Sequence, residues 1–254
     1  MQQRKKKKHS VLLIFFVAAV LVVAFVLTSG LFFKVTAIRV EGGLVTGEKE
    51  VAEMSGISLG DNIFFINKVS AARNIKAQLP YVQEVRISRS LPGTVLIRVT
   101  EAAPAGMIED RGAYWLFDTQ GVLLESVPVL TPPKLPVVRG LTLVSPLPGG
   151  ELDVPEEDRV KVAPLLELLR TLLAEGLWED VSSADVSRLA NLRFTYKEIE
   201  VELGAPDLLE RKLRTMSLAL EQIGGAGTLY LAPVAEGQPS RFIPEQTPAE
   251  PISP

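Results

Sequence analysis

The sequence predicts an α+β protein with a single N-terminal transmembrane helix and two domains beyond it. Three observations predict this class: an uninterrupted apolar run near the N-terminus, a β-α-α-β-β order of hydrophobic patterns directly after it, and then antiparallel strands mixed with two amphipathic helices. The predicted parts are a basic tail at 1–10, a transmembrane helix at 11–33, a first domain at 34–102, a second domain at 103–243 and a disordered proline-rich tail at 244–254.

The predicted transmembrane helix is Val11 to Phe33, which contains no charged side chain. About 20 apolar residues at ~1.5 Å each cross the ~30 Å hydrocarbon core of a bilayer. Arg4 and Lys5–Lys8 precede this run, and basic flanks stay on the cytoplasmic side, so the rest of the chain is expected outside. A cleaved signal peptide is the alternative, but its apolar region is typically ~7–15 residues, and Thr28-Ser29-Gly30 is a poor cleavage site.

The charge balance limits the classes of function that the chain can have. The chain has 27 Lys and Arg against 30 Asp and Glu, and the basic tail takes up part of the positive charge. The portion beyond the helix is therefore acidic, which argues against a general nucleic-acid surface. With no cysteine, the external domains must be stabilised by packed cores.

The first domain begins with a strand at 33–40. Thr46 is expected to cap a short helix, and Asn67 or Ser70 a second helix that ends at Pro80. The apolar residues expected on the inner face of this second helix are Val69, Ala72, Ile75 and Leu79. Alternating strands around 85–89 and 95–99, joined by Leu91-Pro92-Gly93, then form an antiparallel hairpin. The result is a small α+β domain with its helices on one face.

The second domain opens with three short strands, at 106–108, 114–117 and 122–125, which we expect to form a meander. Between residues 127 and 155 the sequence contains seven prolines, and this density predicts an extended connection without regular structure.

Two helices and four strands are expected after this connection. The apolar stripe of the first helix is Val162, Leu165, Leu166, Leu169, Leu172 and Leu173, and that of the second is Leu209, Leu213, Met216, Leu220 and Ile223. Between them, 192–196 and 199–203 alternate as a strand pair. The last predicted strands are 228–231 and 240–243.

Most catalytic sites are excluded by composition. The only histidine is His9, in the basic tail, and cysteine is absent, so triads, histidine–zinc sites and iron–sulfur clusters are not expected outside the membrane. No phosphate-cradling glycine motif occurs. Glu156-Glu157-Asp158 could serve as paired carboxylates, but acids after Pro155 are more readily explained as favourable charges at the start of a helix.

A Ser-Lys dyad is the remaining catalytic alternative, and Ser55, Ser58 and Ser70 are its candidates. Each has a structural explanation as a cap or loop residue. We therefore expect no catalytic residue, no cofactor and no metal.

The last two strands are the remaining candidate site, because little sequence follows to cover them. An exposed edge strand presents unpaired N–H and C=O groups to which a partner segment can add. A plain edge protected by Arg241 and Pro244 is equally consistent with the sequence.

Several segments carry a specific resemblance to a known family. The most specific are Leu79-Pro80-Tyr81-Val82, then 85–89, and then 91–101 with Leu91-Pro92-Gly93; Phe33–Gly42 and Trp115–Gly121, including Phe117-Asp118, add to it. Together these segments resemble the FtsQ/DivIB family of bacterial cell-division proteins. Their order, with a basic tail and one span before them, matches the family over nearly the whole chain. The resemblance implies a polypeptide-transport-associated (POTRA) domain at 34–102 and an FtsQ/DivIB-type β domain at 103–243.

The resemblance also implies a function. Members are non-catalytic connectors in the septal division machinery that associate with membrane proteins of the FtsB/DivIC and FtsL type, so we expect a single-pass protein at the division septum. In the family the C-terminal strands accept a partner by strand addition, and the corresponding positions are Thr228, Leu229, Tyr230, Leu231, Arg241, Phe242 and Ile243. Here Pro233 follows the penultimate strand and leaves the partner register open.

Two alternatives remain. A membrane-anchored cell-wall hydrolase would use Glu156 or Glu157, and a POTRA-containing export protein would require a β-barrel or channel that the sequence beyond Ala102 does not predict.

Overall fold

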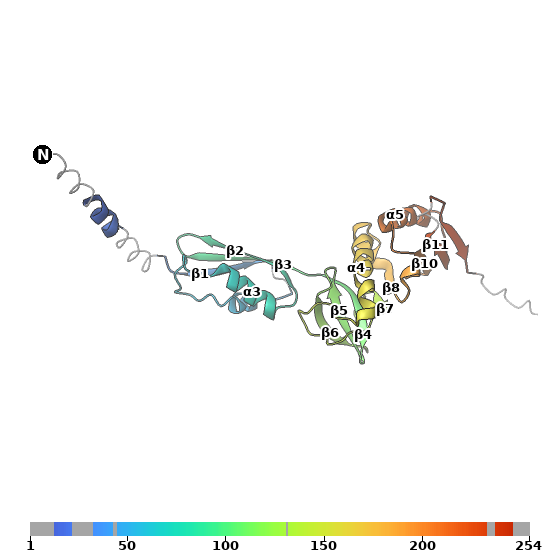
Figure 1. Cartoon of the computed structure of the whole chain (residues 1–254), viewed down its shortest axis with the longest axis horizontal. Coiled ribbons are helices and arrows are strands. Elements are labelled where there is room, and N and C mark those ends of the chain that lie inside the picture. Colours follow the sequence, from blue (N-terminus) through green and yellow to red (C-terminus); the bar gives the residue numbers. More distant parts are fainter. Residues whose placement is uncertain (1–12, 22–32, 43–44, 131, 233–236, 246–254) are drawn as a thin grey trace, which may run out of the picture. The chain divides into compact units, whose positions relative to one another are not determined.

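The computed structural model describes residues 13–21, 33–42, 45–130, 132–232 and 237–245 (Figure 1). Residues 13–21 are helical, and their large apolar side chains are exposed. None of the helices that the structure describes combines the length and hydrophobicity that a membrane crossing requires. The predicted basic tail and most of the predicted span at 11–33 lie outside the described residues. The chain divides into two compact units, Met1–Glu101 and Ala102–Pro254.

The first unit has the predicted β-α-α-β-β order: β1 (Ala37–Glu41), α2 (Glu48–Met54), α3 (Lys68–Gln78), β2 (Val82–Ser90) and β3 (Thr94–Glu101). The sheet order is β1-β3-β2, with β1 parallel to β3 and β2 antiparallel to it. The central strand β3 buries Val95, Ile97 and Val99, which alternate with more exposed residues and pack against Val51 of α2 and Ile75 of α3. The predicted hairpin at 91–93 is therefore confirmed.

Two local predictions in this unit are wrong. Gly47, not Thr46, precedes α2, and the Thr46 N–H instead donates to the Glu101 carboxylate at 2.8 Å. On α3, Val69 is exposed, and the buried positions are Ala71 and Ile75. The cap at Asn67, which accepts from the Ser70 N–H at 3.0 Å, starts the helix one residue before Val69 and turns that side chain outward.

The second unit contains one nine-stranded mixed sheet with the order β12-β11-β10-β9-β8-β7-β4-β5-β6. The first meander is β4 (Pro104–Asp110), β5 (Ala113–Asp118) and β6 (Leu123–Pro128). The remaining strands are β7 (Val137–Arg139), β8 (Val181–Asp185), β9 (Leu192–Tyr196), β10 (Ile199–Gly204), β11 (Gly227–Tyr230) and β12 (Arg241–Pro244).

The pairing of this sheet corrects two expectations. The prediction of antiparallel strands is incomplete, because β4–β7, β7–β8 and β10–β11 are parallel. The proline-rich segment is not wholly without regular structure, because β7 lies in the interior of the sheet. The three residues of β7 contain no proline, so each of them keeps its N–H for the hydrogen bonds of the sheet. The preceding Pro136 takes part through its carbonyl, which accepts the Met107 N–H at 2.9 Å.

Two long helices share a core with one face of the sheet. They are α4 (Arg159–Ala174) and α5 (Leu209–Leu220), which contact each other, as Figure 1 shows. Leu165, Leu168, Leu169 and Leu172 of α4 and Leu209, Leu213 and Met216 of α5 are buried with Phe117, Phe194, Val201 and Leu229 of the strands. Both predicted amphipathic helices are confirmed, although Leu173 is exposed and Leu168 takes its place in the core. The described part of this unit also contains short 3-10 turns at Glu156–Asp158, Trp178–Asp180 and Leu189–Asn191.

Candidate functional site

The residues predicted to bind a partner lie together at one edge of the large sheet. Thr228, Leu229 and Tyr230 are in β11, Leu231 follows it directly, and Arg241, Phe242 and Ile243 are in β12. β12 is the terminal strand of the sheet and is antiparallel to β11. No described strand pairs with its outer side.

The two faces of this strand pair differ in burial. Leu229 and Leu231 are fully buried, and the half-buried Phe242, which is opposite Leu229, packs against the same core. On the other face, the Arg241 guanidinium lies over the Tyr230 ring, 4.9 Å from its centroid, and Ile243 is exposed opposite Thr228. The site therefore offers a firmly attached strand with an accessible face and an accessible edge.

The hydrogen-bond pattern identifies the groups on the outer edge. The Glu245 N–H donates to the Ala226 carbonyl at 3.0 Å, and these two residues are opposite in the β11–β12 register. Hydrogen-bonded and non-hydrogen-bonded pairs alternate along an antiparallel ladder. Ile243 is therefore in a bonded pair with Thr228, whereas the N–H and C=O of Phe242 point outward, as does the C=O of Pro244.

A glycine in β11 permits this packing. A Cβ atom at Gly227 would lie 2.5 Å from the Ile243 carbonyl oxygen and 2.6 Å from the Phe242 ring. Both distances are shorter than real Cβ contacts, and the Ile243 oxygen is a backbone atom that cannot turn aside as a side chain can. A side chain at this position would therefore separate β12 from β11.

A shallow hollow of about 410 Å³ lies beside the edge. Its lining includes Thr228, Ile243 and Pro244, together with the carboxylates Glu198, Glu200 and Glu245. The hollow is therefore acidic. The same open face of the sheet continues through Arg193, whose guanidinium lies 3.4 Å from Glu200 and 3.8 Å from Glu202.

Asp185, at the end of β8, belongs to this charged surface. Burial by itself would raise the pKa of its carboxyl, but hydrogen bonds from Ser187 and the positive charges of Arg193 and Arg139 outweigh that effect, so the pKa is lowered. The open face thus carries ionised groups of both signs.

Two of the three carboxylates considered for catalysis form ion pairs. Glu156 is paired with Arg159 at 2.8 Å, and Asp158 with Lys161 at 2.6 Å, directly before and within the first turn of α4. Lys161 also donates to the Gly140 carbonyl. These contacts attach the start of α4 to the segment after β7, as the helix-start interpretation expects.

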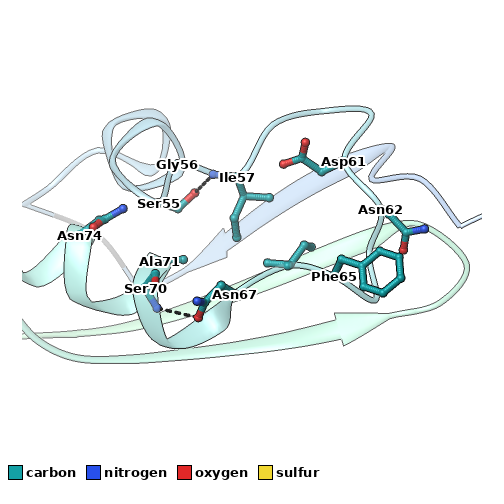
Figure 2. Close-up of a pocket in the computed structure, with 11 residues that line it drawn as sticks. Ser55, Gly56, Ile57, Asp61, Asn62, Phe65, Asn67, Ser70, Ala71 and Asn74 are labelled. Carbon is teal, nitrogen blue, oxygen red and sulfur yellow. Dashed lines mark hydrogen bonds between the residues drawn. The ribbon is translucent and has the colours of Figure 1, made fainter. Parts of the chain in front are cut away.

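The serines considered for a Ser-Lys dyad line or adjoin a pocket of about 370 Å³ in the first unit (Figure 2). The Ser55 hydroxyl donates to the Ala52 carbonyl and accepts from the Ile57 N–H, and the Ser70 N–H donates to Asn67. Ser58 donates its N–H to Asp61. Each serine is thus engaged in local turn or cap geometry, and no lysine lines the pocket.

Comparison with known proteins gives consistent matches. Residues 33–102 match the family model described as "POTRA domain, FtsQ-type". The chain is 26% identical over 215 residues to the cell division protein DivIB of Clostridium botulinum, with 84% of this chain and 82% of the relative covered. It is 29% identical over 185 residues to DivIB of Clostridium acetobutylicum, covering 72% and 71%.

These matches support the FtsQ/DivIB family for this chain. A further FtsQ/DivIB relative, the cell division protein FtsQ of Corynebacterium glutamicum, is 36% identical over 100 residues, which are 39% of this chain and 43% of the relative. The POTRA match coincides with the three-stranded first unit, and the longer clostridial matches extend into the nine-stranded second unit.

Sequence reasoning did not predict which residues line the acidic hollow. Glu200 of β10 reaches Thr228 because β10 and β11 are parallel neighbours connected through α5. The order of a strand, an amphipathic helix and a strand at 199–230 is the signal that could have indicated this pairing, since a parallel pair needs such a crossover.

Proposed function

We propose that this protein is a membrane-anchored, non-catalytic scaffold that connects division proteins at the septum during bacterial cell division. The naming of its relatives as cell division proteins supports the division role. In this proposal residues 11–33 anchor the chain with its N-terminus in the cytoplasm, and both folded units are outside. The charge-free sequence of that segment and the exposed apolar side chains at 13–21 favour such an anchor.

The observation that carries the proposal is the outer edge of β12. A partner segment that adds there would meet the outward N–H and C=O of Phe242, and its side chains would lie beside Ile243 and the Arg241–Tyr230 pair. The strand is short, and Pro244 supplies no donor, so the main-chain register is centred on Phe242. Membrane proteins of the FtsB/DivIC and FtsL type are the partners we propose for this edge.

The acidic hollow adds a prediction about the partner. Glu198, Glu200 and Glu245 favour basic side chains on the segment that crosses the hollow. The same charges disfavour an acidic segment, so they contribute to the choice of partner as well as to its affinity.

The test is site-specific photo-crosslinking in dividing cells, with the photoreactive residue placed at Ile243 of the full-length protein. Ile243 is chosen because its side chain is exposed, whereas the Phe242 ring packs over Gly227. Ser126, exposed on β6 at the opposite end of the sheet, is the matched control. We expect capture of a small single-span membrane protein at Ile243 and none at Ser126; equal capture at both positions, or normal septation after depletion, would contradict the proposal.

A pair of lysine substitutions measures the affinity. Ile243→Lys places a charge on the proposed binding edge and is expected to weaken partner binding about tenfold or more, because an edge lysine opposes strand addition. Ser126→Lys is expected to leave binding unchanged. Both positions are exposed, so the free energy of unfolding should change by no more than ~0.5 kcal/mol in either variant.

A further inference from the structure

One end of the first unit carries a cluster of exposed apolar side chains that the proposed scaffold role does not use. Residues 59–66, here called the aromatic loop, expose Leu59, Phe64 and Phe65, and the turn between β2 and β3 exposes Leu91. Phe65 is 80% exposed and Leu91 58% exposed. Figure 2 shows Phe65 beside Asn62 at one end of the pocket, with Asn74 at the other.

The aromatic loop is held against the residues that directly follow the predicted span. Backbone hydrogen bonds join Ile63 to Phe33 at 2.9 Å, Val35 to Asp61 at 2.8 Å and Gly60 to Val35 at 2.8 Å. The rings of Phe33 and Phe64 meet edge to face, 5.0 Å between centroids. The loop cannot move away from Phe33 without losing these contacts.

The other exposed turn is attached to the same place. The Thr36 N–H donates to the Gly93 carbonyl at 2.7 Å, and a Cβ atom at Gly93 would lie 2.5 Å from the Lys34 carbonyl oxygen. Arg89 donates to the carbonyls of Phe64 and Ile66, at 3.1 and 3.0 Å, which links the end of β2 to the loop. Both turns therefore lie at the end of the unit where the chain enters at Phe33.

The charges at this end are mainly positive. Lys34, Lys68 and Arg89 lie around the aromatic loop, and the acidic residue among them, Asp61, accepts a hydrogen bond from the Ser58 N–H. Exposed aromatic and aliphatic side chains with basic neighbours are the composition that binds the headgroup region of a bilayer.

We propose that the aromatic loop and the Leu91 turn dock onto the lipid surface from which the chain emerges, with Phe65 and Leu91 inserted among the headgroups and Lys34 and Lys68 on anionic lipid. This inference rests on the anchor in the proposed function, because it requires the bilayer to end near Phe33. Docking would set the tilt of the POTRA unit against the membrane, which a single-helix tether alone does not do.

The test uses the full-length protein in vesicles of phosphatidylethanolamine and phosphatidylglycerol that contain lipids with a nitroxide high on the acyl chain. Because the chain has no cysteine, a single fluorescent label can be placed at Leu91→Cys, at Phe65→Cys, or at the control Val45→Cys. Val45 is 68% exposed and lies in the same unit, but its N–H donates to Glu101 at the far end of β3. At ~3.3 Å per residue, Glu101 is about 23 Å along β3 from Thr94, the residue next to the Leu91 turn.

We expect quenching at Leu91→Cys and Phe65→Cys that is at least about twofold stronger than at Val45→Cys. Adding Phe65→Ser to the Leu91→Cys protein should reduce its quenching to near the control, and replacing the anionic lipid with phosphatidylcholine should weaken it. Phe65 is exposed, so the fold tolerates this change, and unchanged circular dichroism verifies it.

Flotation of the vesicles in alkaline carbonate separates the two proposals. Protein that floats but shows equally weak quenching at all three positions would overturn docking and leave the anchor intact. Protein that does not float would overturn the anchor and docking together. Capture of a protein by a photoreactive residue at Phe65 in cells, without quenching in vesicles, would assign the patch to that protein and overturn the lipid proposal.

Discussion

The two edge strands of the nine-stranded sheet, β6 and β12, differ in whether other segments bind their outer side. At the β6 edge, the Leu123 N–H donates to the Gly150 carbonyl and the Leu123 carbonyl accepts from the Gly149 N–H, both at 2.7 Å, so the loop at 147–152 covers the start of the strand. At the β12 edge, no described segment takes the outward groups of Phe242. Unpaired edges favour aggregation. The start of β6 is therefore covered, whereas the outward groups of β12 are accessible to a partner strand.

The first and largest test removes the cover. Leu152 is buried in the main core and its N–H donates to the Gly121 carbonyl, so it anchors the loop at 147–152. Leu152→Ala should lower the free energy of unfolding by about 2–5 kcal/mol, measured by denaturant titration. It should also speed hydrogen exchange at the Leu123 amide and promote self-association through β6. A loss below ~1 kcal/mol with unchanged exchange would mean that the loop is not what protects this edge.

The second test detaches the open edge. Gly227→Ala should push β12 away from β11 because its Cβ would overlap the Ile243 carbonyl, and we expect about 1–3 kcal/mol of destabilisation confined to the end of the sheet. Faster exchange of the Ile243 amide than of the Val201 amide would report this local loss. Gly224→Ala is the matched control, because a Cβ there meets nothing within 4 Å. Similar effects from both substitutions would contradict the packing argument.

The third and smallest test concerns the helix behind the open edge. Lys212 of α5 is 1% exposed, and its ammonium donates to the Ala205 carbonyl at 2.8 Å and to the Asp207 carboxylate at 2.7 Å. The hydrogen bond from Lys212 lowers the pKa of Asp207. A carboxylate with a depressed folded-state pKa contributes stability above its unfolded pKa of ~3.9 and loses that contribution as pH falls through the folded value.

Asp207→Asn should therefore reduce stability at neutral pH, and the difference from the wild type should shrink progressively as the pH falls below about 4. Thermal unfolding of both proteins between pH 3 and 7 measures this convergence. Glu210→Gln, on the exposed side of α5, is the control and should show a smaller difference at neutral pH. A pH-independent difference for Asp207→Asn would indicate that Lys212 depends on the shape of the Asp207 side chain rather than on its charge.

Prediction from sequence succeeded where a single segment contains the whole signal. The hairpin of β9 and β10 has the predicted bounds at 192–196 and begins its second strand at Ile199, because each strand alternates cleanly around a two-residue connection. Both long helices follow from their leucine stripes. Asp118 and Gly121, part of the family resemblance, have a local reason too: the Asp118 carboxylate accepts from the N–H groups of Gln120 and Val122, and Gly121 has a φ of +84°.

Prediction failed where the signal is spread over distant segments or interrupted. β8 was not predicted, and a register shift between Val181 and Ser183 places its buried Val181 and Ala184 three residues apart, which breaks the period of two. β7 has only three residues, and its partners, Met107 and Ser183, are far away in the sequence. The exposed Val69 is a similar failure on a helix, because an error of one residue in where the helix begins changes which side chains face the core.

Local patterns alone were enough for the long helices and most of the strands, and for the two strands that form the candidate site. Composition alone gave the acidic, cysteine-free character of the chain and the lack of a histidine or cysteine site outside residues 1–10. The tertiary structure decided which strands are neighbours, that a loop covers the start of β6 while the outer edge of β12 is open, and that the aromatic loop lies against Phe33. The physical reason is that strand pairing is made by hydrogen bonds between segments that no short window of sequence contains, whereas alternation and helical stripes are set by burial within one segment.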